Sequence, residues 1–217
     1  MFSTKLPRFR ARMIIMAVGV FFMGFFMSFL VELRLGSDPF NTCFLGVAKV
    51  TGLSHGTTVV IVHSILFLLL LWRGRRFISF GTLANMICVG YISDFFRWVW
   101  SLTLPEGIFL VPAVRWTIVI PVVALFVIAA ACYMAADVGV SPFDALPHII
   151  VEAFPHLPFL AVRLTIDLAC VAGGFLTGAD VGVVTAVMAF FIAPILTAVR
   201  RFIEKRLALP AEKEAKA

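Results

Sequence analysis

The sequence has little charge. Asp, Glu, Lys and Arg together make up 14% of its 217 residues, whereas 62% of the residues are hydrophobic. A soluble domain of this length has too small an interior to bury so many apolar side chains. The scarcity of charge therefore excludes a soluble globule and predicts an integral membrane protein, whose main partner is the lipid bilayer.

Cysteines and catalytic motifs are also scarce. The four cysteines, Cys43, Cys88, Cys132 and Cys170, lie in apolar segments and show no CxxC or metal-site spacing, so we interpret them as packed thiols. The chain has no HExxH, no GxSxG and no phosphate-binding loop. We therefore expect no enzyme, no catalytic residue, no cofactor and no metal ion.

One pattern, Gly-x-x-Pro-Phe-(Asn/Asp), occurs twice, at 36–41 and at 139–144. The copies are 103 residues apart, and the same offset pairs identical residues elsewhere in the chain. A membrane chain built from two such halves is typical of transporters and channels. The identical pairs include Arg12 with Arg115, Val59 with Val162, and Thr82 with Thr185.

The apolar runs predict an all-α protein with six transmembrane helices. Two further helical stretches, near 39–51 and 142–154, are too short to span. Each half then contains one long helix, one short helix and two more long helices. We place the spans near 12–33, 55–73, 81–100, 114–136, 158–177 and 181–200.

Three spans per half place the second half upside down relative to the first, which is an inverted repeat. With a cytoplasmic N-terminus, 13 of the 18 lysines and arginines lie inside, four lie outside, and Arg163 lies within a span. The positive-inside rule thus places both termini in the cytoplasm, and the net charge of +6 is a topology signal rather than a nucleic-acid site. The predicted regions are a basic N-terminus (1–11), a first repeat (12–100), an external loop (101–113), a second repeat (114–200) and a charged tail (201–217).

Each copy of the motif has the composition of a helix start. Pro39 and Pro142 suit the first helical turn, where the missing N–H has no partner in any case. Asp38 and Ser141, which precede them, are good N-caps. Each motif therefore predicts a short helix that begins abruptly at its proline.

The third residue after each cap predicts a capping box. Asn41 and Asp144 stand at this position, and their side chains are expected to reach back to the backbone N–H of the cap. In one interpretation the motif only starts an interfacial helix. In the other, the helix re-enters the membrane and lines a cavity, where broken backbone is tolerated. Helix N-termini in such a cavity would favour an anion.

Several polar residues fall inside the predicted spans and are candidates for a substrate pathway. Arg163 and Asp167 are four residues apart and are expected to pair, either as a structural ion pair or as functional groups. His63 lies near mid-span, as a packing residue or as a group that titrates. Asn85 and Asp94 lie in the third span, where pairing of Asp94 with the nearby arginine is the simpler explanation.

The motifs of the first half resemble the YczE/YitT family of bacterial membrane proteins. The resemblance rests on 36–41, 51–57, 73–76, 81–85 and 89–94, and in the second half on 139–144. Met188 and Thr197 stand where a second Asn85 and Asp94 would be. The resemblance implies a multi-pass protein of the bacterial cytoplasmic membrane, without a settled substrate.

We therefore expect a permease that moves a small solute by alternating access. An anionic solute is mildly favoured by the helix N-termini and Arg163, and Asp167 or His63 would carry a coupling proton. The alternative is a membrane subunit that scaffolds or regulates another system without transporting anything. A homo-oligomer is compatible with either function.

Overall fold

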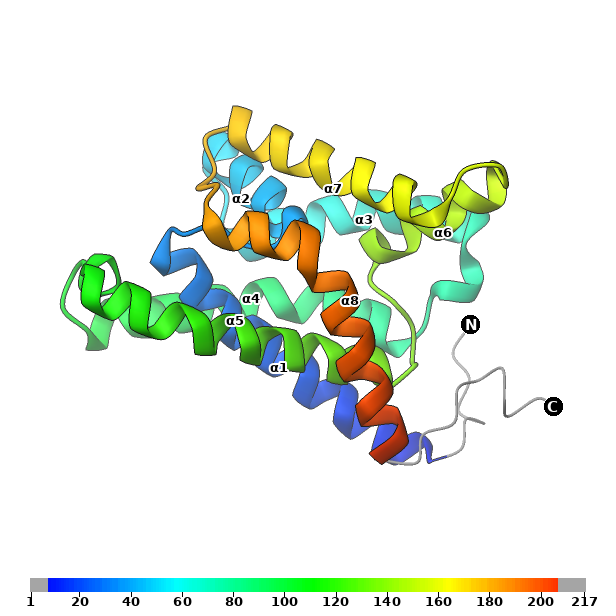
Figure 1. The fold of residues 1–217 in the computed structure, drawn as a ribbon, viewed down its shortest axis with the longest axis horizontal. Helices are drawn as coiled ribbons and strands as arrows, with labels where there is room; N and C mark the ends of the chain where they lie inside the picture. The colour runs from blue at the N-terminus through cyan, green and yellow to red at the C-terminus, as the bar shows by residue number, and fades with distance from the viewer. Residues whose placement is uncertain (1–7, 207–217) are drawn as a thin grey trace.

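The computed structural model describes residues 8–206, without the side chains of 191–194. This part of the chain is helical and contains no strand (Figure 1). Two single-turn 3-10 helices, η1 (Arg75–Phe77) and η2 (Ile108–Leu110), lie in the connections. The α-helices are α1 (Phe9–Leu33), α2 (Pro39–Thr51), α3 (His55–Arg73), α4 (Phe80–Thr103), α5 (Pro112–Ala135), α6 (Pro142–Ala153), α7 (Phe159–Leu176) and α8 (Val183–Arg206).

The all-α class and the pattern of long and short helices are confirmed. α1 begins at Phe9 and α8 continues to Arg206, so helical structure reaches into both segments predicted as tails. Arg, Lys and Glu are good helix formers, and Arg200 donates to Glu204 one turn later at 2.7 Å. The charged sequence after residue 200 therefore extends the helix. The rest of the two tails lies outside the described residues.

Several helices are long and apolar enough to cross a membrane, as an integral membrane protein requires. They are α1, α3, α5 and α7, and the two pieces of α8, Val183–Phe190 and Ile195–Arg206, would make a fifth. α4 is equally long, but Asn85, Asp94 and Arg97 make it more polar. Four to five candidate spans are thus found within the described residues.

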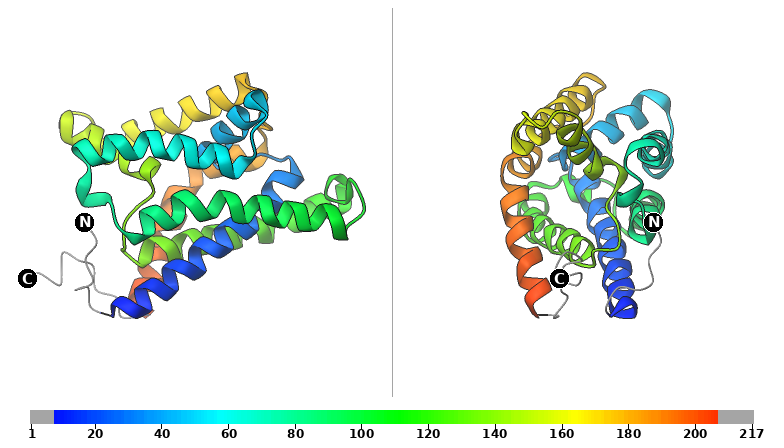
Figure 2. Two further views of the ribbon diagram at one scale, coloured as in Figure 1. Left: turned by 180° about the vertical axis from the view of Figure 1, so that it is seen from behind. Right: turned by 90° about the vertical axis from the view of Figure 1, so that its right-hand side faces the viewer.

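The helices form two layers (Figures 1 and 2). One layer holds α2, α3, α6 and α7, and the other holds α1, α4 and α5, with α8 packed along α5. α3 packs on α4 and joins the layers. An apolar core lies between α2, α3, α6 and α7 and includes Phe44, Val59, Phe143 and Cys170. The repeated motifs therefore lie inside the first layer.

α1 and α5 pack side by side and run in opposite directions (Figure 1). Near the start of α1, Arg12 donates from Nη1 to the carbonyl of Ala136 at the end of α5, at 2.9 Å. Near the start of α5, Arg115 donates from Nε to the carbonyl of Leu33 at the end of α1, at 2.7 Å. Each arginine thus satisfies a free carbonyl at the negative end of the other helix.

A second pair of hydrogen bonds ties the segments before the short helices to the starts of long helices. The amide of Gly81 in α4 donates to the carbonyl of Val138 at 2.7 Å, and the amide of Val184 in α8 donates to the carbonyl of Leu35 at 3.0 Å. The first two N–H groups of a helix have no partner within it. These bonds supply one such partner and hold each motif against a long helix.

Candidate functional site

The two motif helices begin next to each other and run apart (Figure 1). The rings of Phe40 and Phe143, the second residues of α2 and α6, have centroids 3.9 Å apart. Phe44, one turn further along α2, meets Phe143 edge-on at 5.9 Å. The two helix starts therefore form one place in the fold, which we call the motif junction.

The expected helix starts and caps are confirmed in both copies. α2 begins at Pro39 and α6 at Pro142. The side chain of Asp38 accepts from the amide of Asn41 at 3.2 Å, and that of Ser141 accepts from the amide of Asp144 at 3.1 Å. The turns before the caps use glycine at positive φ, +93° at Gly36 and +103° at Gly139.

The expected capping box forms differently. Asn41 does reach back, but its Nδ2 donates to the carboxylate of Asp38 at 2.7 Å. In the second copy, the hydroxyl of Ser141 and the carboxylate of Asp144 are 2.7 Å apart. The cap side chain already lies over the first helical turn, so it is the nearest partner for the third residue. Each motif therefore contains a bond between two side chains instead of a bond to the cap backbone.

Arg163 of α7 joins the second motif to the interior of α7. Its Nη1 donates to Asp144 at 2.9 Å and its Nε to Asp167 at 3.2 Å. Its guanidinium lies over the ring of Phe40, 4.5 Å from the centroid. The predicted pairing of Arg163 with Asp167 is confirmed, whereas the contacts with Asp144 and Phe40 were not predicted, because no sequence spacing links α7 to the motifs.

Carboxyl groups outnumber guanidinium groups at the motif junction among the described residues. Asp38 interacts electrostatically with both Asp144 and Asp167. Within the described part of the chain, Arg163 is the one guanidinium paired with this group. Asp167 is only 4% exposed, and among the described residues its Oδ1 has no hydrogen-bond partner. A buried carboxylate oxygen without a partner is rare and costly, so it marks a place for a proton or a ligand.

The first motif is linked to a histidine instead of an arginine. The Nε2 of His55, at the start of α3, is 3.0 Å from Oδ1 of Asn41. Its Nδ1 is buried and lacks a partner within the described part of the chain. Sequence reasoning did not select His55, although it lies in the run 51–57 that carries the family resemblance and directly follows Ser54, which caps α3.

Asp94 lies beside this histidine rather than in the motif junction. Its Oδ2 accepts the amide of Gly56 in the first turn of α3 at 2.7 Å, and its Oδ1 is 3.7 Å from Arg97. Arg97 also donates to Glu32 of α1 at 2.8 Å. The predicted pairing of Asp94 with Arg97 is confirmed, and Asp94 additionally anchors the start of α3.

His63 and Asn85 lie on different helices, α3 and α4. His63 is 5% exposed and lies edge-on to Phe44, with ring centroids 5.2 Å apart. Its Nδ1 is buried without a partner among the described residues, so it borders the motif junction. Asn85 is buried in α4, and no hydrogen bond within the described region joins it to the junction.

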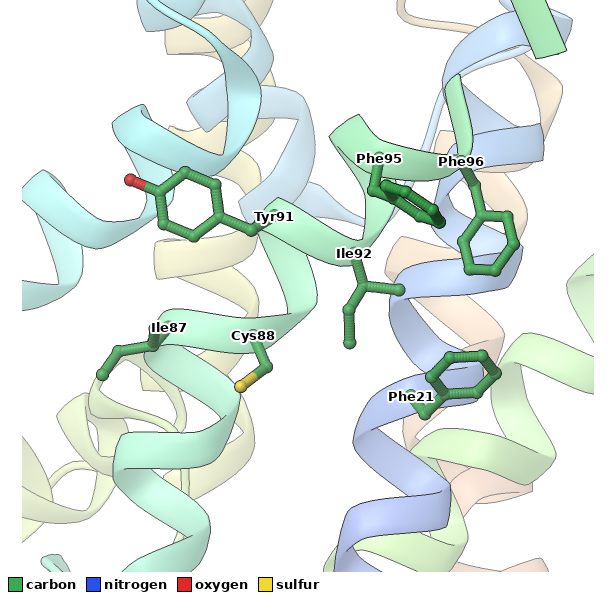
Figure 3. Close-up of a pocket in the computed structure, with 7 residues that line it drawn as sticks. All are labelled: Phe21, Ile87, Cys88, Tyr91, Ile92, Phe95 and Phe96. Atoms are coloured by element: carbon green, nitrogen blue, oxygen red, sulfur yellow. The ribbon is translucent and has the colours of Figure 1, made fainter. Parts of the chain in front are cut away.

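No group of three or more His, Cys, Asp or Glu side chains within the described residues is arranged to hold a metal ion. An apolar groove of about 300 Å³ lies on the outer side of α1 and α4 (Figure 3). Its lining is apolar or aromatic apart from the Tyr91 hydroxyl, which points away, so it suits lipid rather than a polar solute. The lining residues are Phe21, Ile87, Cys88, Tyr91, Ile92, Phe95 and Phe96.

The model of a family of unknown function (DUF6198) matches residues 10–201 and so covers nearly all of the described chain. No curated protein matches, and no solved structure matches.

Proposed function

Since the chain belongs to the DUF6198 family, whose function is unknown, we propose from the geometry that it is a small-solute permease working by alternating access. One observation carries the proposal: the starts of two non-spanning helices meet at charged side chains that are buried, as in Asp167, or half-buried, as in Arg163 and Asp144. Ionisable groups at membrane depth are expensive and typical of substrate or ion pathways. Broken helices are tolerated at such depth where they line a cavity.

The proposed architecture is a six-span inverted repeat of the YczE/YitT type. It is supported by the reciprocal hydrogen bonds, because each partner in one bond lies 103 residues from its counterpart in the other. Arg12 bonds Ala136 and Arg115 bonds Leu33, while Gly81 bonds Val138 and Val184 bonds Leu35. α1 and α5 run antiparallel (Figure 1), as a two-fold axis in the membrane plane requires.

We place this protein in the bacterial cytoplasmic membrane with both termini in the cytoplasm. α4 and α8 complete the six spans, and the distribution of 13 inside and four outside basic residues supports the orientation. A reporter fused after Ala217 should then behave as cytoplasmic, and one inserted between α4 and α5 as external. Equal behaviour of the two fusions would contradict six spans.

The charge balance of the motif junction favours a cationic solute over the anion expected from the sequence. The caps Asp38 and Ser141 already accept from helix amides, so fewer N–H groups face the junction. The guanidinium of Arg163 is already bound to two carboxylates. A further anion would meet net negative charge in a medium of low dielectric constant.

Proton coupling is proposed for Asp167. Its buried, unpartnered oxygen and its place beside Arg163 allow it to lose a proton when a cation binds and to regain it when the cation leaves. Asp167→Asn keeps the shape of the side chain and removes this proton. It should keep the folded protein in the membrane and abolish proton-coupled flux. His63 borders the junction and is the second candidate for this role.

Cysteine labelling tests whether water reaches the motif junction. After replacement of the four native cysteines, Ser37→Cys and Ser141→Cys introduce nearly isosteric thiols at two buried positions. A membrane-impermeant thiol reagent should label both, with rates that differ between right-side-out and inverted vesicles. Ile65→Cys, which is exposed on the apolar surface of α3, should stay unlabelled.

The same experiment addresses the alternative function. A subunit that only scaffolds or regulates another system needs no continuous water path. Absence of labelling at both junction positions in both vesicle types, with normal amounts of protein, would therefore favour the scaffold and oppose the permease.

A further inference from the structure

We propose that the motif junction binds a small organic cation of the guanidinium class, and that the side chain of Arg163 occupies this site when the ligand is absent. The inference rests on the proposed transport function and adds a substrate class to it. It rests on the contacts of Arg163, on the carboxyl groups that surround it in excess, and on its position in α7.

The contacts of Arg163 make up a complete guanidinium site. Two N–H groups on different nitrogens meet the carboxylates of Asp144 and Asp167, at 2.9 and 3.2 Å. The flat face lies over the ring of Phe40 at 4.5 Å. Carboxylates in the guanidinium plane and a ring above it are the features that recognise this cation rather than a compact ammonium ion. A free guanidinium would find the same three groups.

Three carboxyl groups surround the single guanidinium of Arg163 at this site. Asp38 interacts electrostatically with Asp144 and Asp167, and Oδ1 of Asp167 is buried with no partner in the described residues. One guanidinium does not neutralise three carboxylates, so the junction has to take up protons or a cation. The unpartnered oxygen shows where an additional donor from a ligand would be accepted.

Arg163 is partly exposed and lies near the start of its helix. It lies four residues from Phe159, the first residue of α7, which is a rise of about 6 Å. Its side chain is 22% exposed, whereas that of Asp167 is 6% exposed. A long arginine stem allows the charged head to reach a nearby helix end. Exchange between Arg163 and a free cation thus needs a side-chain movement and no rearrangement of α7.

The transport test uses the full-length protein in proteoliposomes that enclose a pH-sensitive dye. Guanidinium chloride is added outside, with equal sodium chloride and sodium acetate as controls. Entry of one guanidinium in exchange for one proton should raise the internal pH several-fold faster than either control. Asp167→Asn should reduce the response to that of protein-free vesicles.

The occupancy of the site by Arg163 is tested separately by binding. Millimolar guanidinium should raise the apparent melting temperature of the purified protein, and equal sodium should not. Arg163→Lys keeps the positive charge but loses the forked contact, so it should compete less and bind guanidinium several-fold more tightly. Arg163→Ala should be destabilised and largely restored by guanidinium, and Arg163→Ala combined with Asp167→Ala should not be restored.

The outcomes separate this inference from the proposed function. Failure of guanidinium to bind or to move protons, together with sided labelling of Ser37→Cys and Ser141→Cys, would overturn the substrate class and leave the permease standing. Absence of any guanidinium response together with absence of labelling would overturn the substrate class and the permease. An Arg163→Lys variant that binds guanidinium no more tightly than the unchanged protein would show that Arg163 does not occupy the ligand site.

Discussion

The two copies of the motif have the same backbone and different chemistry. Both begin with a glycine at positive φ, a polar cap and a proline. The first copy continues to a neutral partner, because Asn41 meets His55. The second continues to a charged one, because Asp144 meets Arg163. The scaffold is thus repeated, whereas the groups suited to binding a solute belong mainly to the second copy.

This difference separates two kinds of constraint. The glycines, caps and prolines have the same role in both copies of the motif. They allow a short helix to begin abruptly beside a long one. The ionisable residues are not repeated. They lie together at the motif junction, where the starts of α2 and α6 meet. The same substitution of a glycine, cap or proline should therefore have similar effects on stability in the two copies. Substitutions of the ionisable residues should affect the second copy differently from the first.

The largest and most symmetric effect is expected at the motif glycines. A Cβ at Gly36 would lie 2.1 Å from Oγ1 of Thr185, and one at Gly139 would lie 2.7 Å from Oγ1 of Thr82, in each case with backbone atoms within about 3 Å. Positive φ adds strain of roughly 1–3 kcal/mol for a non-glycine residue. Gly36→Ala and Gly139→Ala should each abolish folded protein in the membrane, measured by size-exclusion profiles of detergent extracts.

Gly52 supplies the matched control for these glycines. It also has positive φ, +72°, but a Cβ there would meet nothing within 4 Å. Gly52→Ala should therefore give folded protein. If only one of the two motif glycines tolerates alanine, the matched roles of the two turns are refuted.

Single changes in the ion pair of Arg163 and Asp167 should have the next largest effect on stability. The first copy of the motif has no equivalent pair to change. Arg163→Ala leaves the buried carboxylate of Asp167 without its cation, which costs about 3–5 kcal/mol. Asp167→Ala leaves Arg163 paired with Asp144 and should cost less. The double change removes the buried carboxylate together with its cation and should cost less than Arg163→Ala alone. Thermal unfolding in detergent measures the three variants. A double variant less stable than Arg163→Ala would show that Asp167 is not destabilised by the loss of its cation.

Exchange of Asn41 and Asp144 between the copies should have a smaller effect of a different kind. Asp144→Asn removes one of two charged partners of Arg163, at a cost of about 1.5–3 kcal/mol. Asn41→Asp replaces the donor that lies 2.7 Å from Asp38 with a second carboxylate.

The two exchanges should also differ in how they respond to pH. Two adjacent carboxylates hold a shared proton more tightly when folded than when unfolded. The stability of Asn41→Asp should therefore be greatest at low pH and fall as the pH rises. Asp144→Asn should show no such added decline. Parallel curves for the two variants between acidic and neutral pH would contradict the difference between the copies.

Local sequence patterns were sufficient for the starts and caps of the motif helices, but not for the partner of the third residue after each cap. The prolines and caps predicted where α2 and α6 begin, and the four-residue spacing predicted that Arg163 and Asp167 pair. The contact of Arg163 with Asp144 and Phe40 joins elements that no spacing rule connects. His55 was missed because a histidine in the first turn of a helix has no distinctive pattern until its partner is known. Asn85 was selected for its polarity within a span, yet no hydrogen bond in the described structure brings it to the junction.

The smallest effect on stability is expected for loss of the helix caps, which also compares the two copies of the motif most directly. Asp38 and Ser141 each accept one helix amide, at 3.2 and 3.1 Å, so loss of either cap should cost about 0.5–2 kcal/mol. Each change also removes the bond between the two side chains of its motif, Asp38 with Asn41 and Ser141 with Asp144, both at 2.7 Å. Ser141→Ala removes no charge. Asp38→Ala also removes negative charge near Asp144 and Asp167, which offsets part of the lost cap. Asp38→Ala should therefore destabilise the protein less than Ser141→Ala in thermal unfolding. The opposite order would mean that Asp38 does not add to the excess negative charge, and the argument for a cationic solute would lose its third carboxylate.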